Sequence, residues 1–208
     1  MAFSFSYMWL ILGITILASL IAFGNETFFN KNKFVPYLIN RNPLEWFRFI
    51  SSGFIHADFM HLFLNMFVFY SFGSNLNYYF NDMFGAKGNL YFLFLYISAI
   101  AVSEIPTYIK NRNNPYYASI GASGAVAAIT FANILISPTS DILMMGIRMP
   151  AIVFGVIYLA AEYFLGKRKG DNINHDAHFW GAVYGFVFTG LLQPNLFLLF
   201  VEKVKHII

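Results

Sequence analysis

Cysteine is absent from the sequence and charged residues are scarce, and each absence excludes a class of protein. Without cysteine the chain has no disulfide bonds, no zinc site built from thiolates and no cysteine nucleophile. Asp, Glu, Lys and Arg make up 11% of the 208 residues, whereas soluble domains carry about 25%. Because 58% of the residues are hydrophobic, a soluble globular domain and a disordered chain are both excluded. The class that remains is an integral membrane protein.

The net charge of +3 does not indicate a nucleic-acid partner. The 13 Lys and Arg residues lie between apolar stretches and form no basic face. We therefore expect no nucleic acid among the partners, and a lipid bilayer as the surroundings.

Six stretches have few enough charges to cross a bilayer as helices, which takes about 20 apolar residues. They are residues 1–25, 59–81, 88–103, 113–140, 149–166 and 177–201. The first lacks the basic start of a signal peptide, so it is predicted to be a retained helix. The sequence thus predicts an all-α membrane protein, a bundle of six transmembrane helices in a single domain over residues 1–208.

Polar residues inside these stretches are informative, because an unpaired polar group in a bilayer is costly. In the second stretch, His61 and Asn65 are four residues apart and share one helical face, with His56 just before them. They either bond a neighbouring helix at the membrane interface or direct hydrogen-bond donors into a cavity.

The fourth stretch carries the segment Gly121-Ala122-Ser123-Gly124. Small residues in membrane helices usually allow close helix packing. Near the start of a helix, however, Ser123 would also lie beside backbone N–H groups that can stabilise a developing oxyanion. Both interpretations stay open on this segment alone.

The sixth stretch adds a histidine to a seam of small residues. Gly181 and Gly185 form the seam, and His178 lies on the same face. Packing of this seam on the small residues of the fourth stretch would bring His178 to Ser123. A serine hydroxyl needs such an adjacent base to become a nucleophile.

Two neighbours of His178 are weaker candidates, His175 for the base and Asp176 for a carboxylate that orients it. His175 precedes the apolar run in a polar loop, so we interpret it as interfacial. Asp176 lies two residues from His178 and therefore faces another side of the helix. We predict a Ser-His dyad without a carboxylate.

Taken together, these motifs resemble the rhomboid family of intramembrane serine proteases. The resemblance rests on three motifs in order along the chain and places the core of the domain at about residues 40–195. The motifs are His56-x4-His61-x3-Asn65, Gly121-x-Ser123-Gly124 and Ala177-His178-x2-Gly181-x3-Gly185.

The resemblance implies Ser123 as the nucleophile and His178 as the general base. His61, Asn65 and the backbone at Gly121 would stabilise the oxyanion. His56 and Arg48 would support the site, although Phe47 stands where family members often have a tryptophan before the arginine. The implied site needs no cofactor and no metal.

The resemblance also implies partners and a location. The substrates would be single-span membrane proteins, cut in or near the transmembrane segment, whereas no oligomeric state is implied. The expected location is a bacterial inner membrane with the site on the extracytoplasmic side. The loop charges oppose this orientation, because nine Lys and Arg fall on that side and four on the side of the termini.

Two other functions remain open. One is a catalytically inactive rhomboid-like protein that binds membrane clients. The other is a small transporter lined by His56, His61, His175 and His178. Other membrane proteases fit less well, because no glutamate lies between paired histidines and the apolar stretches carry one carboxylate, Glu162.

Overall fold

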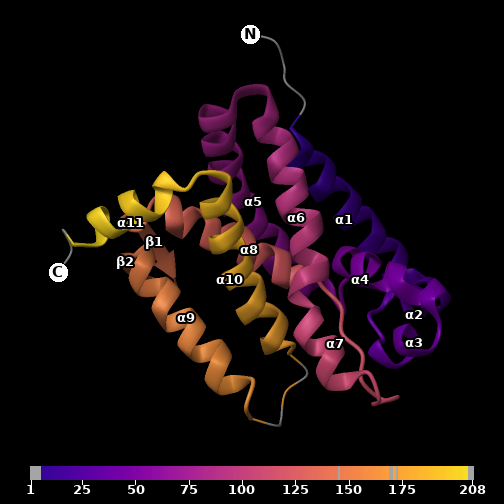
Figure 1. Ribbon diagram of the computed structural model, residues 1–208. Helices are drawn as coiled ribbons and strands as arrows, with labels where there is room; N and C mark the ends of the chain where they lie inside the picture. Colours follow the sequence, from indigo (N-terminus) through magenta and orange to yellow (C-terminus); the bar gives the residue numbers. More distant parts are fainter. Residues whose placement is uncertain (1–5, 145, 169–170, 172, 206–208) are drawn as a thin grey trace.

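A short helix, α8 (Ser123–Ile136), lies at the centre of a bundle of longer helices (Figure 1). All of its residues from Gly124 to Ile136 are buried, so neighbours surround it on every side. The computed structural model describes residues 6–144, 146–168, 171 and 173–205.

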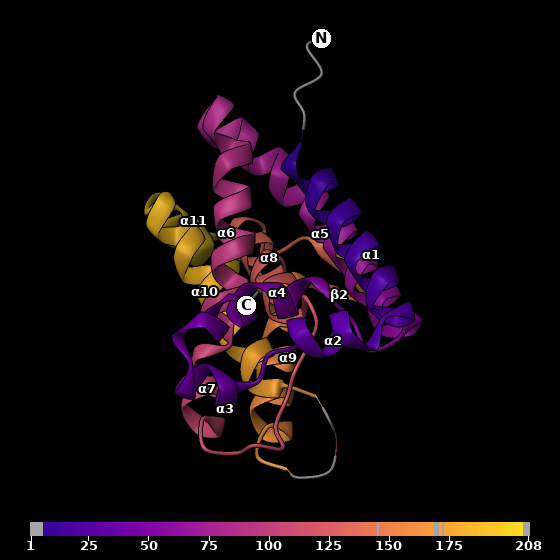
Figure 2. The ribbon, with the colours of Figure 1, turned by 90° about the vertical axis from the view of Figure 1, so that its right-hand side faces the viewer.

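The other helices differ greatly in length. The longer ones are α1 (Tyr7–Gly24), α5 (Phe59–Phe84), α6 (Gly88–Ser103), α9 (Ala151–Leu165), α10 (His175–Leu192) and α11 (Asn195–Lys205). Of these, α5, α6, α9, α10 and α11 contact α8. The shorter ones are α2 (Glu26–Asn32), α3 (Pro36–Arg41), η1 (Pro43–Phe47), α4 (Arg48–Ser51), η2 (Ser52–Phe54), η3 (Gly85–Lys87) and α7 (Ile105–Asn111). Helices α2, α3 and α4 with η1 and η2 fold the long loop between α1 and α5 into one group (Figure 2).

Aromatic side chains fill the core on the side of α1, α5 and α6. Phe69 and Phe80 of α5 are fully buried, as are Phe92 and Tyr96 of α6. The rings of Phe69 and Tyr96 meet at 5.2 Å in an edge-to-face arrangement. Helix α9 differs, because only Ala151 and Gly155 are buried along its length. It therefore packs loosely at the edge of the bundle.

The bounds of the helices agree with the predicted apolar stretches, except for the fourth and the sixth stretch. Residues 1–5 of the first stretch lie outside the described residues. Helix α8 begins at Ser123 rather than at residue 113, because the chain before it is extended and pairs Ser119 with Phe34. Helix α10 ends at Leu192 rather than near residue 201, and α11 leaves it at an angle of 115°. Pro194 at this break has no N–H to continue the helix.

The connection between α8 and α9 contains a β-hairpin. Strands β1 (Asp141–Met144) and β2 (Ile147–Pro150) are antiparallel, with Ile142 opposite Met149. Gly146, in the turn, has a φ of +82°, a backbone conformation that favours glycine. The hairpin is a small exception to an otherwise helical fold.

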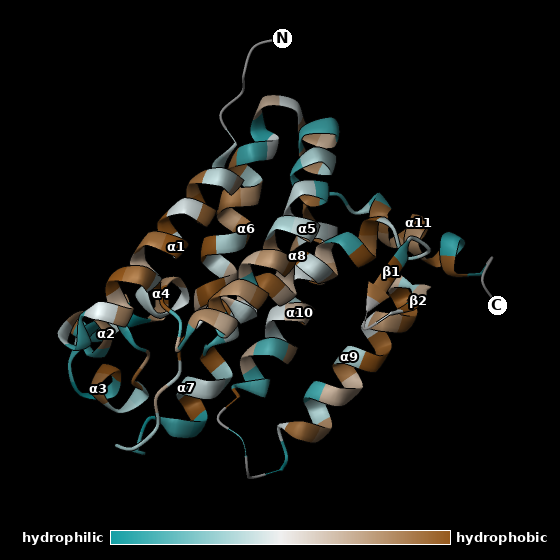
Figure 3. Cartoon of the chain, turned by 180° about the vertical axis from the view of Figure 1, so that it is seen from behind, coloured by the Kyte–Doolittle hydropathy of each residue, from teal (hydrophilic) through white to brown (hydrophobic). Residues whose placement is uncertain are grey.

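Hydrophobic residues predominate along α1 (Figure 3), and large apolar side chains are exposed on several helices. Large side chains such as Trp9, Leu17, Phe63, Phe67 and Val156 are more than half exposed. Among the described residues, two helical segments are long and apolar enough to cross a membrane, Tyr7–Gly24 and Phe59–Asn111. The bent pair of α10 and α11 would make a third, and α8 and α9 are apolar but shorter. The chain has an all-α membrane fold, and the count of six spans stays a prediction.

The small-residue seam of α10 packs directly on the backbone of α8. A Cβ atom at Gly185 would lie 1.9 Å from the carbonyl oxygen of Ala128, and one at Gly181 would lie 2.2 Å from that of Gly124. Both separations are impossible for real atoms, so only glycine fits at these two positions. The predicted seam is confirmed.

Gly185→Ala is expected to destabilise the protein by about 2–3 kcal/mol or more, because the added methyl group meets backbone that no side-chain movement can relieve. Thermal unfolding in detergent micelles measures the effect. Gly13→Ala in α1 is the control, since a Cβ there meets nothing within 4 Å. Equal unfolding temperatures for the two variants would contradict the packing described.

Candidate active site

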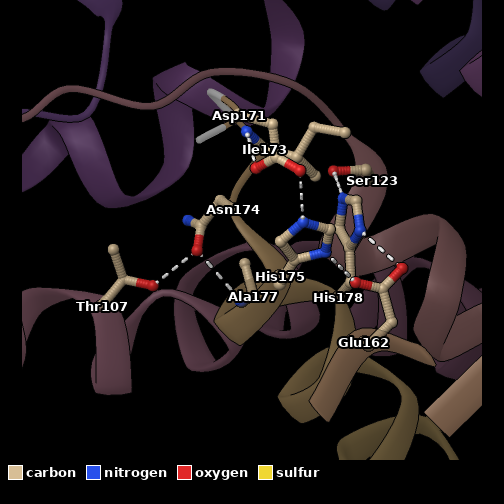
Figure 4. A network of polar contacts seen from close by, with 9 residues as sticks. All are labelled: Thr107, Ser123, Glu162, Asp171, Ile173, Asn174, His175, Ala177 and His178. Carbon is tan, nitrogen blue, oxygen red and sulfur yellow. Dashed lines mark hydrogen bonds and ion pairs between the residues drawn. The ribbon is translucent and has the colours of Figure 1, made fainter. Parts of the chain in front are cut away.

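The seam between α8 and α10 brings Ser123 and His178 into contact (Figure 4). Ser123 Oγ lies 2.7 Å from His178 Nε2, a hydrogen-bond distance. Both residues belong to the first turn of their helices, so the contact lies at one end of the bundle. The two residues meet as the sequence predicts.

The start of α10 is fixed by hydrogen bonds to α6 and α7. Asn174 caps the helix by accepting from the Ala177 N–H at 3.1 Å. It also accepts from the Thr107 hydroxyl at 2.8 Å and donates to the Glu104 carboxylate at 2.9 Å. These bonds hold the first turn, and with it His178, in one position.

His61 lies against the backbone just before Ser123. Gly121 has a φ of +116°, and a Cβ there would lie 2.8 Å from His61 Nε2. The Ala57 N–H points to His61 Nδ1 at 3.5 Å, so Nε2 carries the proton of the neutral ring. This N–H is therefore directed towards the segment that contains Ser123.

Asn65 follows His61 by one helical turn and lines the same cavity as Ser123. Its amide donates one hydrogen bond to the His61 carbonyl oxygen at 2.9 Å. Because an amide nitrogen carries two hydrogens, the second stays available to a group in the cavity. Asn65 is buried, with 8% of its surface exposed.

His56 lies behind the site, fully buried. Its Nε2 accepts from the Ala122 N–H at 3.4 Å, so its Nδ1 donates to the Ser19 hydroxyl at 2.9 Å. Ser19 donates in turn to the Phe54 carbonyl oxygen at 3.2 Å. Burial, together with the nearby His61, lowers the pKa of His56 to about 3. A neutral His56 thus connects α1 to the residue before Ser123.

Arg48 holds the long first loop together. Its buried guanidinium pairs with Glu45 and donates to the carbonyl oxygens of Asn30 at 3.0 Å and Lys33 at 2.8 Å. The turn that follows Arg48 reaches the site, because the Ser52 carbonyl oxygen accepts from the Gly121 N–H at 3.0 Å. This N–H is therefore not available to an oxyanion, contrary to the expectation for Gly121. Arg48 therefore acts on the loop and not on the cavity.

A carboxylate contacts His178, and the expectation of none is wrong. Glu162 of α9 has Oε1 3.1 Å from His178 Nδ1 (Figure 4). Asp176 bonds Lys110 at 2.9 Å instead, as its place on the helix implies. The spacing of residues within α10 could not reveal a partner of His178 that lies on α9. The available signal was Glu162 itself, a lone carboxylate in an apolar stretch, where an unpaired charge is costly.

His175 is buried rather than interfacial, with 6% of its surface exposed. Its Nδ1 lies 2.5 Å from Glu162 Oε2, and its Nε2 lies 3.1 Å from Asp171 Oδ2. Burial was missed because the polar residues around it predict a solvated loop. His175 therefore belongs to the same network as the His178 side chain.

Ligand atoms of Glu162, His175 and His178 all lie within 4.8 Å of one another, so this set could also hold a metal ion. The contacts of 2.5 and 3.1 Å are hydrogen-bond distances. The absence of a metal stays a prediction.

A cavity of about 770 Å³ opens beside Ser123, between α5, α8, α9 and the β-hairpin. Polar and apolar side chains both line it. They include Asn65, Val68, Ser123, Thr130, Phe154 and Tyr158. The hydroxyl of Ser123 thus has space in front of it for a bound chain and for water.

Comparison with known proteins identifies the family. The model of the Rhomboid domain matches residues 43–195. This chain belongs to the rhomboid family. The matched segment contains every residue proposed for the site, from Arg48 to His178. The family includes intramembrane serine proteases as well as inactive members.

Several rhomboid relatives are similar along most of this chain. RHOMBOID-like protein 12, mitochondrial, of Arabidopsis thaliana is 27% identical over 180 residues, 81% of this chain and 53% of the relative. Rhomboid-like protein 11, chloroplastic, of the same plant is 29% identical over 177 residues, 76% and 56% of the two chains. The human presenilin-associated rhomboid-like protein, mitochondrial, is 28% identical over 141 residues, 64% and 35%. This rhomboid chain spans about half the length of the first two relatives and 35% of the length of the third.

Acid is expected to destabilise the protein through His56. Its pKa of about 3 lies below the ordinary value of 6.5, so the unfolded chain binds more protons between these pH values. The contribution of neutral His56 is therefore complete above pH 6.5 and is lost as the pH falls towards 3.

Thermal unfolding of the wild type and of His56→Gln in detergent, from pH 7 to pH 4, measures this effect. The unfolding temperature of the variant should fall less steeply with acid. If the unfolding temperatures of the two proteins fall in parallel with pH, the buried imidazole contributes nothing to the pH dependence of stability.

Proposed function

We propose that this rhomboid protein is an intramembrane serine endopeptidase that hydrolyses a peptide bond in or near the transmembrane segment of single-span membrane proteins. The observation that carries the proposal is the 2.7 Å contact between Ser123 Oγ and His178 Nε2. A serine and a neutral imidazole at this distance form the nucleophile and base of acyl transfer.

In the first half of the reaction, Ser123 Oγ attacks the carbonyl carbon of the scissile peptide while His178 Nε2 takes its proton. The oxyanion that forms accepts from the Nε2–H of His61, the free hydrogen of Asn65 and backbone N–H groups at the start of α8. His178 then gives the proton to the leaving amine. Water hydrolyses the acyl-enzyme by the same steps in reverse order, with His178 again as the base.

The cavity supports a membrane protein as the substrate. It lies between α5 and α9, and α9 buries only two of its residues, so a substrate helix can approach from the side of the bilayer. The Thr130 hydroxyl and the Asn133 amide oxygen line the cavity and can accept hydrogen bonds from the backbone N–H groups of a segment that unwinds there, since their own hydrogens are donated within the protein.

An inactive rhomboid-like protein that binds membrane clients is the alternative. The hydrogen bond between Ser123 and His178 favours the enzyme, because client binding requires neither residue. A histidine-lined transporter is less well supported. His56 is buried against Ser19 and Ala122, and His175 is bonded through both ring nitrogens, so neither faces the cavity.

The finer location is also a proposal. A bacterial inner membrane, with the site on the extracytoplasmic side, stays a prediction, and the relatives described above are mitochondrial or chloroplastic proteins. Among the loop charges that oppose this orientation, Lys169 lies outside the described residues.

Ser123→Ala and His178→Ala are each expected to abolish cleavage of a single-span test substrate in proteoliposomes. A fluorophosphonate probe should label the wild type and fail to label Ser123→Ala. Ser74→Ala is the control, since this serine of α5 bonds Tyr70 and lies outside the cavity. Full cleavage by Ser123→Ala would contradict the proposal.

Asn65→Ala is expected to slow cleavage by about 100-fold or more, because one donor to the oxyanion is lost. The loss should appear in kcat, with KM nearly unchanged, since the bond forms in the transition state. A variant that raises KM alone would assign Asn65 to substrate binding instead.

A further inference from the structure

Glu162 uses both of its carboxylate oxygens inside the bundle, and the reaction described above uses neither. Oε1 faces His178 Nδ1 at 3.1 Å, and Oε2 faces His175 Nδ1 at 2.5 Å. Only 12% of the Glu162 side chain is exposed. A buried carboxylate with two directed contacts has one orientation rather than several.

The contact with Glu162 selects the tautomer of His178. A carboxylate only accepts hydrogen bonds, so the proton of a neutral His178 ring lies on Nδ1. Nε2 is then free to accept from Ser123 Oγ at 2.7 Å. In the other tautomer Nε2–H would point at the hydroxyl and could not take its proton. The same contact stabilises the imidazolium that forms during attack.

His175 and Asp171 hold Glu162 in place. Both nitrogens of His175 face carboxylate oxygens, Nδ1 that of Glu162 and Nε2 that of Asp171 at 3.1 Å. Two acceptor-only partners require a donor on each nitrogen, which is the charged form of the ring. His175 thus lies as a cation between two anions and compensates the charge of Glu162.

The distances favour hydrogen bonds over a metal ion in this cluster. Ligands of tetrahedral zinc, with bonds of 2.0–2.1 Å, lie about 3.3 Å apart. His175 Nδ1 and Glu162 Oε2 are 2.5 Å apart, which is too close for two ligands of one ion.

We propose that Glu162 is a positioning residue that holds His178 in the tautomer competent to activate Ser123, and that His175 and Asp171 hold Glu162. This inference rests on the proposed function. It extends the Ser-His pair to a Ser123–His178–Glu162 triad whose third member comes from α9.

Glu162→Gln is the sharpest test, because the amide has the size of the carboxylate but lacks its charge and can donate to Nδ1. We expect kcat, and the rate of labelling by a fluorophosphonate, to fall by about 100-fold or more. KM should stay close to that of the wild type, and the variant should stay folded at the assay temperature, which thermal unfolding measures. Asp176→Asn makes the same chemical change on α10, in a residue bonded to Lys110, and should change neither rate.

Chemical rescue provides a second measurement. Glu162→Ala leaves a space in which formate can accept from Nδ1, so added formate should restore part of the labelling rate, whereas chloride at equal ionic strength should not. A purely structural role would be rescued by neither salt. If Glu162→Gln labels as fast as the wild type, the positioning role is wrong, even though Ser123→Ala still abolishes labelling and the proposed function stands.

A third measurement, by NMR, depends neither on activity nor on the folding of a Glu162 variant. Proton NMR of Ser123→Ala, with ¹⁵N-labelled histidine, should show a strongly downfield Nδ1–H resonance from His178. Its absence would overturn the proposal. EDTA and added Zn²⁺ should leave wild-type labelling unchanged, and a chelator effect that disappears in His175→Gln would assign the cluster to a metal ion instead.

Discussion

The direct contact between the backbones of α8 and α10 is the constraint on which the rest of the structure depends. Gly181 and Gly185 have no side chain that would separate the helices, and carbonyl groups of α8 occupy the space. Any larger residue would move α10 outwards along with the imidazole it carries. A hydrogen bond tolerates only a few tenths of an ångström of such movement, so the chemistry of Ser123 depends on the absence of two Cβ atoms.

The segment before Ser123 is held from the opposite side by the loop region. Ser52 and His56 bond the backbone of Gly121 and Ala122, and His56 is anchored to α1 through Ser19. The nucleophile therefore lies between two rigid supports, the seam on one side and these backbone contacts on the other. Such support keeps donors in place before the substrate arrives, which is how fixed dipoles stabilise a transition state.

Local patterns predicted much of this arrangement. The spacing of His61 and Asn65 and the seam around Gly181 are properties of single helices, so the sequence predicts them well. The partner of His178 could not be predicted in this way, because Glu162 lies on another helix and only the packing of α9 brings it close.

The ends of helices were predicted less well, for a different reason. A count of charges does not detect a bend, because the residues around Pro194 carry no charge, like those of a spanning helix. The burial of His175 was likewise hidden, since its polar neighbours in sequence are not its neighbours in space. Its partner Glu162 comes from α9, as does the partner of His178.

The length of α8 has a consequence for water. Its 14 residues extend about 21 Å, whereas the hydrocarbon core of a bilayer is roughly 30 Å thick. A helix of this length reaches at most one surface and leaves its other end at membrane depth. If that is the end with Ser123, hydrolysis takes place in a hydrated recess beneath the headgroups. A shortfall of about two helical turns in one central helix thus decides how deep in the membrane a peptide bond can meet water.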